Sequence, residues 1–117
     1  MAGVPDEEKV INKKPDNLFS GVSVENLIKA ERLPAGEWAR GMVIGKKDDG
    51  TCGLIGDTGF DETNVWAVVM ENKKLDAEGF VQVYFSGEFN KVALIVSNSF
   101  DIGKLVIPAR KLSIILE

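Results

Sequence analysis

The sequence predicts a single, mainly β domain, built as a small barrel or sandwich with one or two short helices. From Val22 onward, short apolar runs are separated by turn residues, a pattern typical of many short strands. No internal repeat or low-complexity tract interrupts the pattern. The 117 residues, 44% of them hydrophobic, suffice for one domain with its own core.

Residues 1–20 differ in composition from the rest of the chain. They carry charges of both signs and two prolines, and large apolar side chains are scarce before Leu18 and Phe19. Such a stretch buries too little apolar surface to offset the entropy lost on ordering. We expect residues 1–20 to be a flexible N-terminal arm and residues 21–117 to be the folded domain.

The first half of the domain combines an ambiguous segment, a strand and a loop. Residues 22–33 fit a strand or a helix, and they end at a turn because Pro34 disfavours the helical region for the preceding residue. Residues 42–44 form an apolar strand core. The glycine-rich residues 53–64 and the polar residues 72–79 are expected to be loops and turns.

The second half holds the clearest strands. Residues 65–70 are a continuous apolar run, typical of a strand covered on both faces, whereas residues 80–85 alternate between two faces. Another buried strand is expected at residues 92–96. Gly87 indicates a bulge or corner, and Pro108 is compatible only with a short helix. In total, we expect five or six short strands.

The chain contains no histidine, which removes the commonest general base and the commonest metal ligand. A Ser-His-Asp or Cys-His catalytic arrangement cannot be built without it. Cys52 is the sole cysteine, so an intrachain disulfide is excluded, and we interpret this residue as a buried thiol. We therefore expect a protein that is not an enzyme and uses no cofactor.

Two weaker chemical signals lie in the loop at residues 53–64. Its glycines lack the Gly-Lys-Ser/Thr ending of a phosphate-binding P-loop and the spacing of a dinucleotide-binding loop. Its carboxylates do not match the spacing of a calcium-binding EF-hand, so we expect solvated side chains and no metal site. These carboxylates are Asp57, Asp61 and Glu62.

The charge pattern argues against nucleic acid and membrane as partners. The net charge is −4 and the basic residues occur as isolated pairs, whereas nucleic-acid binding requires a basic stripe. Several aromatic residues fit a core better than a stacking platform for bases; they are Trp38, Trp66, Phe80, Tyr84 and Phe89. The longest apolar run is too short to span a membrane, and no signal-peptide pattern opens the chain, so we expect synthesis in a reducing cytoplasm.

Three blocks of the sequence resemble the lambda-like bacteriophage head decoration family. Residues 35–46 read Ala-Gly-Glu-Trp-Ala-Arg-Gly-Met-Val-Ile-Gly-Lys, where the family has a small-residue turn leading into an Arg-Gly-x-Val-Leu-Gly-Lys type of strand. Residues 65–94 include Gly-Glu-Phe-Asn followed by Lys-Val-Ala-Leu, the most characteristic piece. Residues 17–21, Asn-Leu-Phe-Ser-Gly, are similar to the family's entry segment.

The resemblance implies a β-tulip-like domain that stabilises the outer surface of an expanded phage head. Such a protein is made in the host cytoplasm and binds as a homotrimer over the three-fold positions of the major capsid protein. The expected capsid-binding residues of the arm are Asn17, Leu18, Phe19, Val22 and Val24, which would act by strand addition. The motif residues expected to have structural roles are Arg40, Gly41, Gly45, Gly87, Glu88, Phe89 and Asn90.

Two other functions stay open at this point. One is a phage tail or neck β-protein, for which ring formation would be the distinguishing property. The other is a nucleic-acid-binding barrel of the OB or Sm kind, although the net charge of −4 speaks against it.

Overall fold

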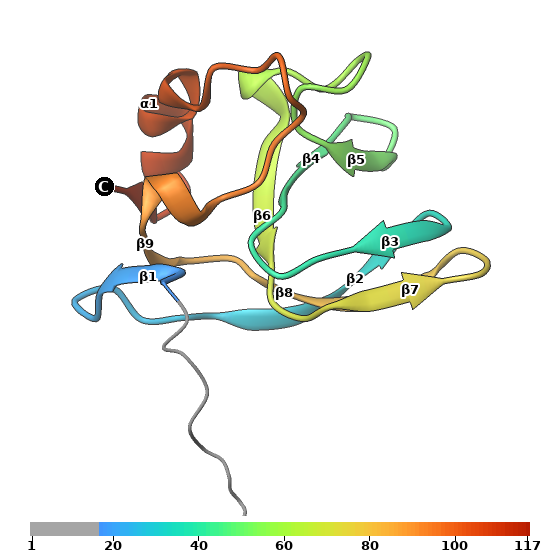
Figure 1. Ribbon diagram of the computed structural model, residues 1–117, viewed down its shortest axis with the longest axis horizontal. Helices are drawn as coiled ribbons and strands as arrows, with labels where there is room; N and C mark the ends of the chain where they lie inside the picture. The colour runs from blue at the N-terminus through green and yellow to red at the C-terminus, as the bar shows by residue number, and fades with distance from the viewer. Residues whose placement is uncertain (1–16) are drawn as a thin grey trace, which may run out of the picture.

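The computed structural model describes residues 17–117, so our expectations about residues 1–16 lie outside the described part of the chain. The described part contains ten strands and one α-helix (Figure 1). The strands are β1 (Phe19–Gly21), β2 (Ile28–Leu33), β3 (Gly36–Trp38), β4 (Val43–Lys46), β5 (Cys52–Leu54), β6 (Val65–Val69), β7 (Lys73–Leu75), β8 (Gly79–Tyr84), β9 (Gly87–Phe89) and β10 (Ile114–Leu116). The helix α1 is Val106–Arg110, and short 3₁₀ helices cover Glu62–Asn64, Lys91–Ala93 and Ile102–Leu105.

The strands form three sheets, which confirms the mainly β class. A five-stranded antiparallel sheet has the order β2-β8-β6-β4-β5, and a three-stranded sheet has the order β1-β9-β10 with β10 parallel to β9. Strands β3 and β7 pair as a separate ribbon. Within the described residues, no hydrogen-bonded ladder joins β2 to β5, so the expected barrel is not closed.

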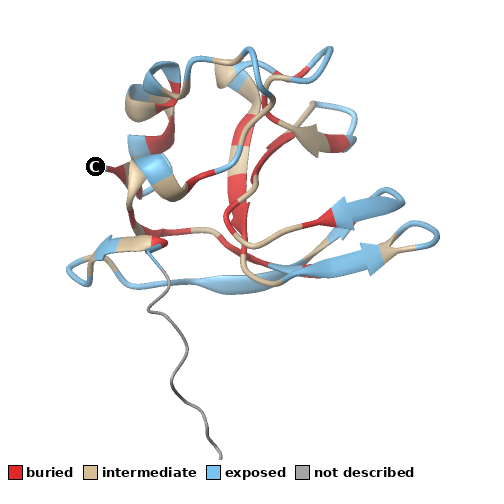
Figure 2. Ribbon diagram, viewed as in Figure 1, coloured by how far each residue is buried: buried red, intermediate tan, exposed pale blue. Residues whose placement is uncertain are grey.

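The core lies on both faces of the five-stranded sheet, and its central strand β6 shows why. Val68 belongs to a cluster covered by the three-stranded sheet and the C-terminal segment, whereas Ala67 and Val69 belong to a second cluster with Leu33 and Ile44. Successive side chains of a strand point to opposite faces, so a continuous apolar run can fill two cores. Figure 2 shows β6 as largely buried, as the sequence predicted.

The alternation expected at residues 80–85 is confirmed in β8, with one exception. Val81 and Val83 are buried on the inner face, and Phe80 and Gln82 are exposed on the outer face. Tyr84 continues the outer row and yet is buried, because the Phe19 ring packs edge-on against it at 5.1 Å between centroids. Gly87 is the first residue of β9, separated from the end of β8 by two residues, and it has a positive φ of 148°.

Several expected elements are wrong. Residues 92–96 do not form a strand: a 3₁₀ helix covers Lys91–Ala93, and only Ile95 makes an isolated bridge, to Met42. Val92 is 87% exposed, so this segment is not apolar on both sides. The expected total of five or six strands is too low because short polar segments become strands through pairing; Lys73–Leu75, for example, pairs with β3.

The ambiguous residues 22–33 become a strand over their second half, Ile28–Leu33, which pairs with β8 along its whole length. In α1, Pro108 occupies the first turn, where backbone N–H groups have no partner within the helix, so proline removes no hydrogen bond there. Within residues 17–117, no helix is both long and apolar enough to cross a membrane.

Candidate interaction surface around strand β1

The folded domain begins by Leu18, earlier than the boundary we expected at residue 20. Leu18 is 3% exposed and belongs to the first core cluster, and its carbonyl oxygen accepts a hydrogen bond from Asn90 N at 2.7 Å. The next residues form β1, which pairs antiparallel with β9 at Phe19 and Phe89. Residues 18–20 therefore belong to the domain and not to a free arm.

The aromatic ring of Phe19 holds β1 against the rest of the domain. It stacks on Phe89 with 5.3 Å between centroids and meets Tyr84 edge-on. Tyr84 and Phe89 are themselves 5.8 Å apart, so the three rings form one cluster. Aromatic contacts of this geometry stabilise a structure beyond the burial of apolar area alone.

The Arg40 side chain packs against two rings of this aromatic cluster. Its guanidinium lies 5.7 Å from the Phe19 ring centre and 5.6 Å from that of Tyr84. It also donates hydrogen bonds to the Met70 carbonyl and the Tyr84 hydroxyl, each at 2.9 Å. A planar guanidinium can stack on rings while its N–H groups donate in fixed directions, which an ammonium cannot do. We call Leu18, Phe19, Arg40, Tyr84, Phe89 and Asn90 the β1 anchor.

Two motif glycines allow the backbone to pass close to the β1 anchor. Gly41 has φ +98°, and a Cβ there would lie 3.1 Å from the carbonyl oxygen of Ala93. Its N–H donates to Val69 O and its carbonyl accepts from Ile95 N, both at 2.9 Å. Gly87 has φ +148°, and a Cβ there would meet the Asn26 side chain. Both positions therefore require glycine.

The other motif residues have simpler positions. Glu88 is the middle residue of β9, and its carboxylate occupies the space that a side chain at Gly21 would need. Asn90 accepts a hydrogen bond from Ala93 N at 2.9 Å and so starts the following 3₁₀ helix. Gly45 lies in β4, away from the β1 anchor, where a Cβ would meet Ile55 at 2.8 Å.

The structure divides the five expected capsid-binding residues into three groups. Leu18 and Phe19 pack into the domain and do not lie in a free arm. Their expected contact with the capsid stays a prediction. Val24 is half-buried. Only Asn17 and Val22 are exposed, and Val22 is 94% exposed.

Exposed apolar side chains also lie on the outer face of the β2–β8 pair. Ile28 and Phe80 share this face and are each about half exposed, and the Arg32 guanidinium covers one side of the Phe80 ring at 5.2 Å. Leu27, just before β2, is exposed to a similar degree. Phe80 is thus a surface residue, and the expectation that it fills the core is wrong. Figure 2 shows β2 and β7 as exposed strands along the same side of the molecule.

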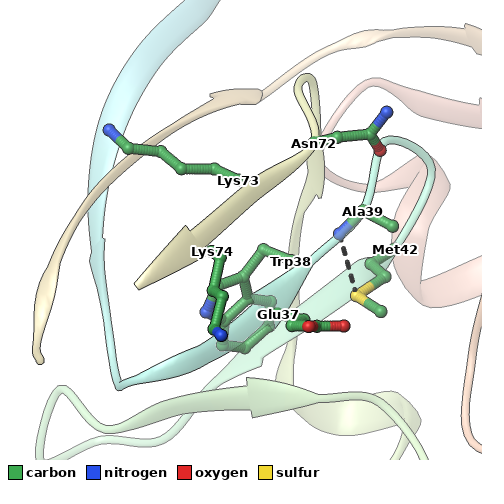
Figure 3. A pocket seen from close by; sticks show the side chains of 7 residues that line it. All are labelled: Glu37, Trp38, Ala39, Met42, Asn72, Lys73 and Lys74. Atoms are coloured by element: carbon green, nitrogen blue, oxygen red, sulfur yellow. Dashed lines mark hydrogen bonds between the residues drawn. The ribbon is translucent and has the colours of Figure 1, made fainter. Parts of the chain in front are cut away.

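A groove of about 410 Å³ lies beside the β3–β7 ribbon (Figure 3). Trp38 is buried at its base, where the indole N–H donates to the Pro34 carbonyl at 3.0 Å. Met42 accepts a hydrogen bond from Ala39 N through its sulfur atom. The rim carries Glu37, Asn72, Lys73 and Lys74, and Lys73 is held by the Phe80 carbonyl at 2.8 Å.

The other candidate chemical groups are tied to structural partners. Burial and, to a smaller extent, the nearby Glu31 carboxylate together raise the pKa of the Cys52 thiol to about 11, so the thiol stays protonated near neutral pH. Asp61 caps a 3₁₀ helix by accepting from the Thr63 side chain and backbone, which lowers its pKa. Among residues 17–117, no three Cys, Asp or Glu side chains gather as a metal site.

No protein-family model matches this chain, and a search of curated proteins finds no match either.

Proposed function

We propose that the protein is a structural protein that decorates the outside of an expanded bacteriophage head. In this proposal it binds as a homotrimer over the three-fold positions of the major capsid protein and stabilises the shell. The supporting observation is that the three sequence blocks resembling the lambda-like decoration family meet at one place. Residues 17–21, Arg40 with Gly41, and residues 87–90 all contribute to or contact the β1 anchor.

This convergence suits a protein that holds its partner through the N-terminal segment. The β1 anchor ties Leu18 and Phe19 firmly to the core, so force on the preceding residues would be transmitted to the domain. An extended segment can add a strand to a sheet edge of the capsid protein. Three such segments on one trimer would bind much more tightly than one, because the second and third events are intramolecular.

Deletion of residues 1–16 is the direct test of this proposal. The deletion must stop before Leu18, since Leu18 and Phe19 belong to the core, and removing them would unfold β1. We expect the shortened protein to stay folded and to bind expanded, undecorated heads at least about tenfold more weakly than the full chain. Co-sedimentation with expanded heads measures the binding, and unexpanded proheads serve as the control.

A matched surface variant controls for nonspecific effects. Val92→Ser changes an exposed apolar residue outside the β1 anchor and is expected to bind as the unmodified protein does. Saturable binding of the full chain, near one copy per capsid subunit, would support the proposal. Full affinity after the deletion would contradict the role of the arm. No binding of the full chain to either shell would contradict the decoration function itself, and assembly into rings would then favour the tail or neck protein.

A further inference from the structure

The two outer strands of the five-stranded sheet come close together without pairing. β2 pairs only with β8 and β5 pairs only with β4, yet β2 and β5 approach each other across the second core cluster. A closed barrel would have a ladder of backbone hydrogen bonds at this position. In the described structure no such ladder joins β2 to β5. We call the gap between these two strands the seam.

A single carboxylate bridges the seam. Glu31 of β2 has a side chain that is only 12% exposed, and its two oxygens accept from different strands. Oε2 lies 3.0 Å from Lys46 Nζ of β4, and Oε1 accepts from Trp66 Nε1 of β6 at 3.0 Å. The Cys52 sulfur of β5 lies 3.9 Å from Oε2. One side chain of β2 therefore contacts side chains of β4, β5 and β6, none of which pairs with β2.

The two hydrogen-bond partners of Glu31, Lys46 and Trp66, also contact each other. The Lys46 ammonium also lies 4.7 Å above the Trp66 ring, so the two partners of Glu31 support each other. Removing the largely buried Glu31 carboxylate would leave the Lys46 ammonium and the Trp66 indole N–H without this acceptor. Losing one partner in this way costs more free energy than the interaction itself contributes. A cleft of about 420 Å³ borders the seam, with Cys52 and Lys46 among the residues that line it.

We propose that Glu31 is a clasp that keeps the open sheet curved like a barrel, and that the seam is the part of the domain that opens first. Elsewhere in the sheet, neighbouring strands are joined by ladders whose bonds break together. At the seam, the release of one side chain frees β2 from β5. Local openings of this kind occur well below the free energy of global unfolding. The inference concerns the isolated domain and does not depend on the proposed capsid role.

Cys52 is a natural reporter of this opening. It is the only cysteine of the chain, it is buried, and it borders the seam. Native-state alkylation with iodoacetamide therefore measures how often the seam opens. For the unmodified protein, we expect a labelling rate that changes little with low urea concentrations, whereas global unfolding, followed by circular dichroism, rises steeply with urea.

The variant Glu31→Gln tests the clasp. Glutamine keeps the size and can accept from Trp66, but it loses the charge that holds Lys46, so we expect labelling at least about tenfold faster. The matched control is Glu78→Gln, which lines the same cleft but forms an exposed ion pair with Arg32. This control is expected to label as the unmodified protein does.

The folded pKa of Cys52 separates opening from a change in the buried thiol, because burial and, to a smaller extent, Glu31 raise this pKa. A thiol that reacts while buried labels faster in Glu31→Gln only by the factor by which its folded thiolate fraction rises, which thiolate absorbance measures. A thiol that reacts after opening is solvated, so its labelling rate below pH 9 depends on how often the seam opens, and we expect the acceleration to exceed that factor. The proposal is overturned if Glu31→Gln labels at the unmodified rate, if the change in thiolate fraction accounts for its faster labelling, or if labelling of the unmodified protein tracks global unfolding with urea.

Discussion

Arg40 is a motif residue whose structural role is clear only from its contacts in the folded chain. In the sequence it is one of 14 basic residues, and the block at residues 35–46 in which it stands is what resembles the decoration family. In the structure its guanidinium stacks on Phe19 and Tyr84 and donates to the Met70 carbonyl. The cation–π contacts and charge-assisted hydrogen bonds join segments that lie about 20 to 45 residues away in sequence.

At the residue scale, the clearest prediction concerns Gly41. We expect Gly41→Ala to lower the free energy of unfolding by about 1–3 kcal/mol, because a non-glycine residue is strained at its positive φ and its Cβ would press on Ala93 O. Gly50→Ala is the matched control, since Gly50 also has positive φ but has open space around it. Urea denaturation should show a smaller loss for the control. Equal losses would contradict the importance of the close approach.

At the element scale, β1 is a short strand that the sequence placed in the arm. Three residues carry little intrinsic preference for a strand, and β1 forms because β9 supplies its ladder and the aromatic cluster supplies its packing. The same reasoning explains β3 and β7, whose exposed lysines and glutamate gave no strand signal. Short elements of this kind are decided by their partners.

Leu18 tests whether β1 belongs to the fold. We expect Leu18→Ala to lower the free energy of unfolding by about 2–5 kcal/mol, because the substitution leaves a cavity in the first core cluster. Val22→Ala, four residues later and exposed, is expected to change it by less than about 0.5 kcal/mol. Thermal or urea denaturation monitored by circular dichroism measures both. A negligible effect of Leu18→Ala would show that β1 is dispensable for the domain.

At the scale of the whole molecule, Cys52 links stability to pH. Its folded pKa of about 11 lies above the ordinary 9.0, mainly because the thiol is buried. Between these values the unfolded chain loses the proton while the folded chain keeps it, so this contribution to stability is complete below pH 9 and is lost as pH rises toward 11. We expect the urea midpoint of the unmodified protein to fall more between pH 8 and pH 10 than that of Cys52→Ala.

The Cys52→Ala variant is the necessary control, since rising pH also affects the rest of the chain, equally in both proteins. Alanine keeps the site apolar and removes the only thiol of the chain. If both proteins lose stability equally with rising pH, the burial of Cys52 has no energetic consequence in this range.

The sequence by itself determined the mainly β class, the two-sided burial of β6 and the alternation of β8. These follow from the periodicity of apolar side chains along single strands, which is local information. It also predicted that Cys52 is buried, and it marked Gly87 as a special position. These predictions rest on residue type and on the pattern of nearby residues along the chain.

Only the tertiary structure decided that Leu18 belongs to the domain, which strands pair and which side chains Glu31 contacts. Leu18 and Phe19 enter the core because Tyr84 and Phe89 offer them an apolar surface, and those residues are 65 or more positions away in the chain. Glu31 had no distinguishing sequence context, and its partners Lys46 and Trp66 come from other strands. Such contacts depend on distances in space, which the spacing of residues along the chain does not specify.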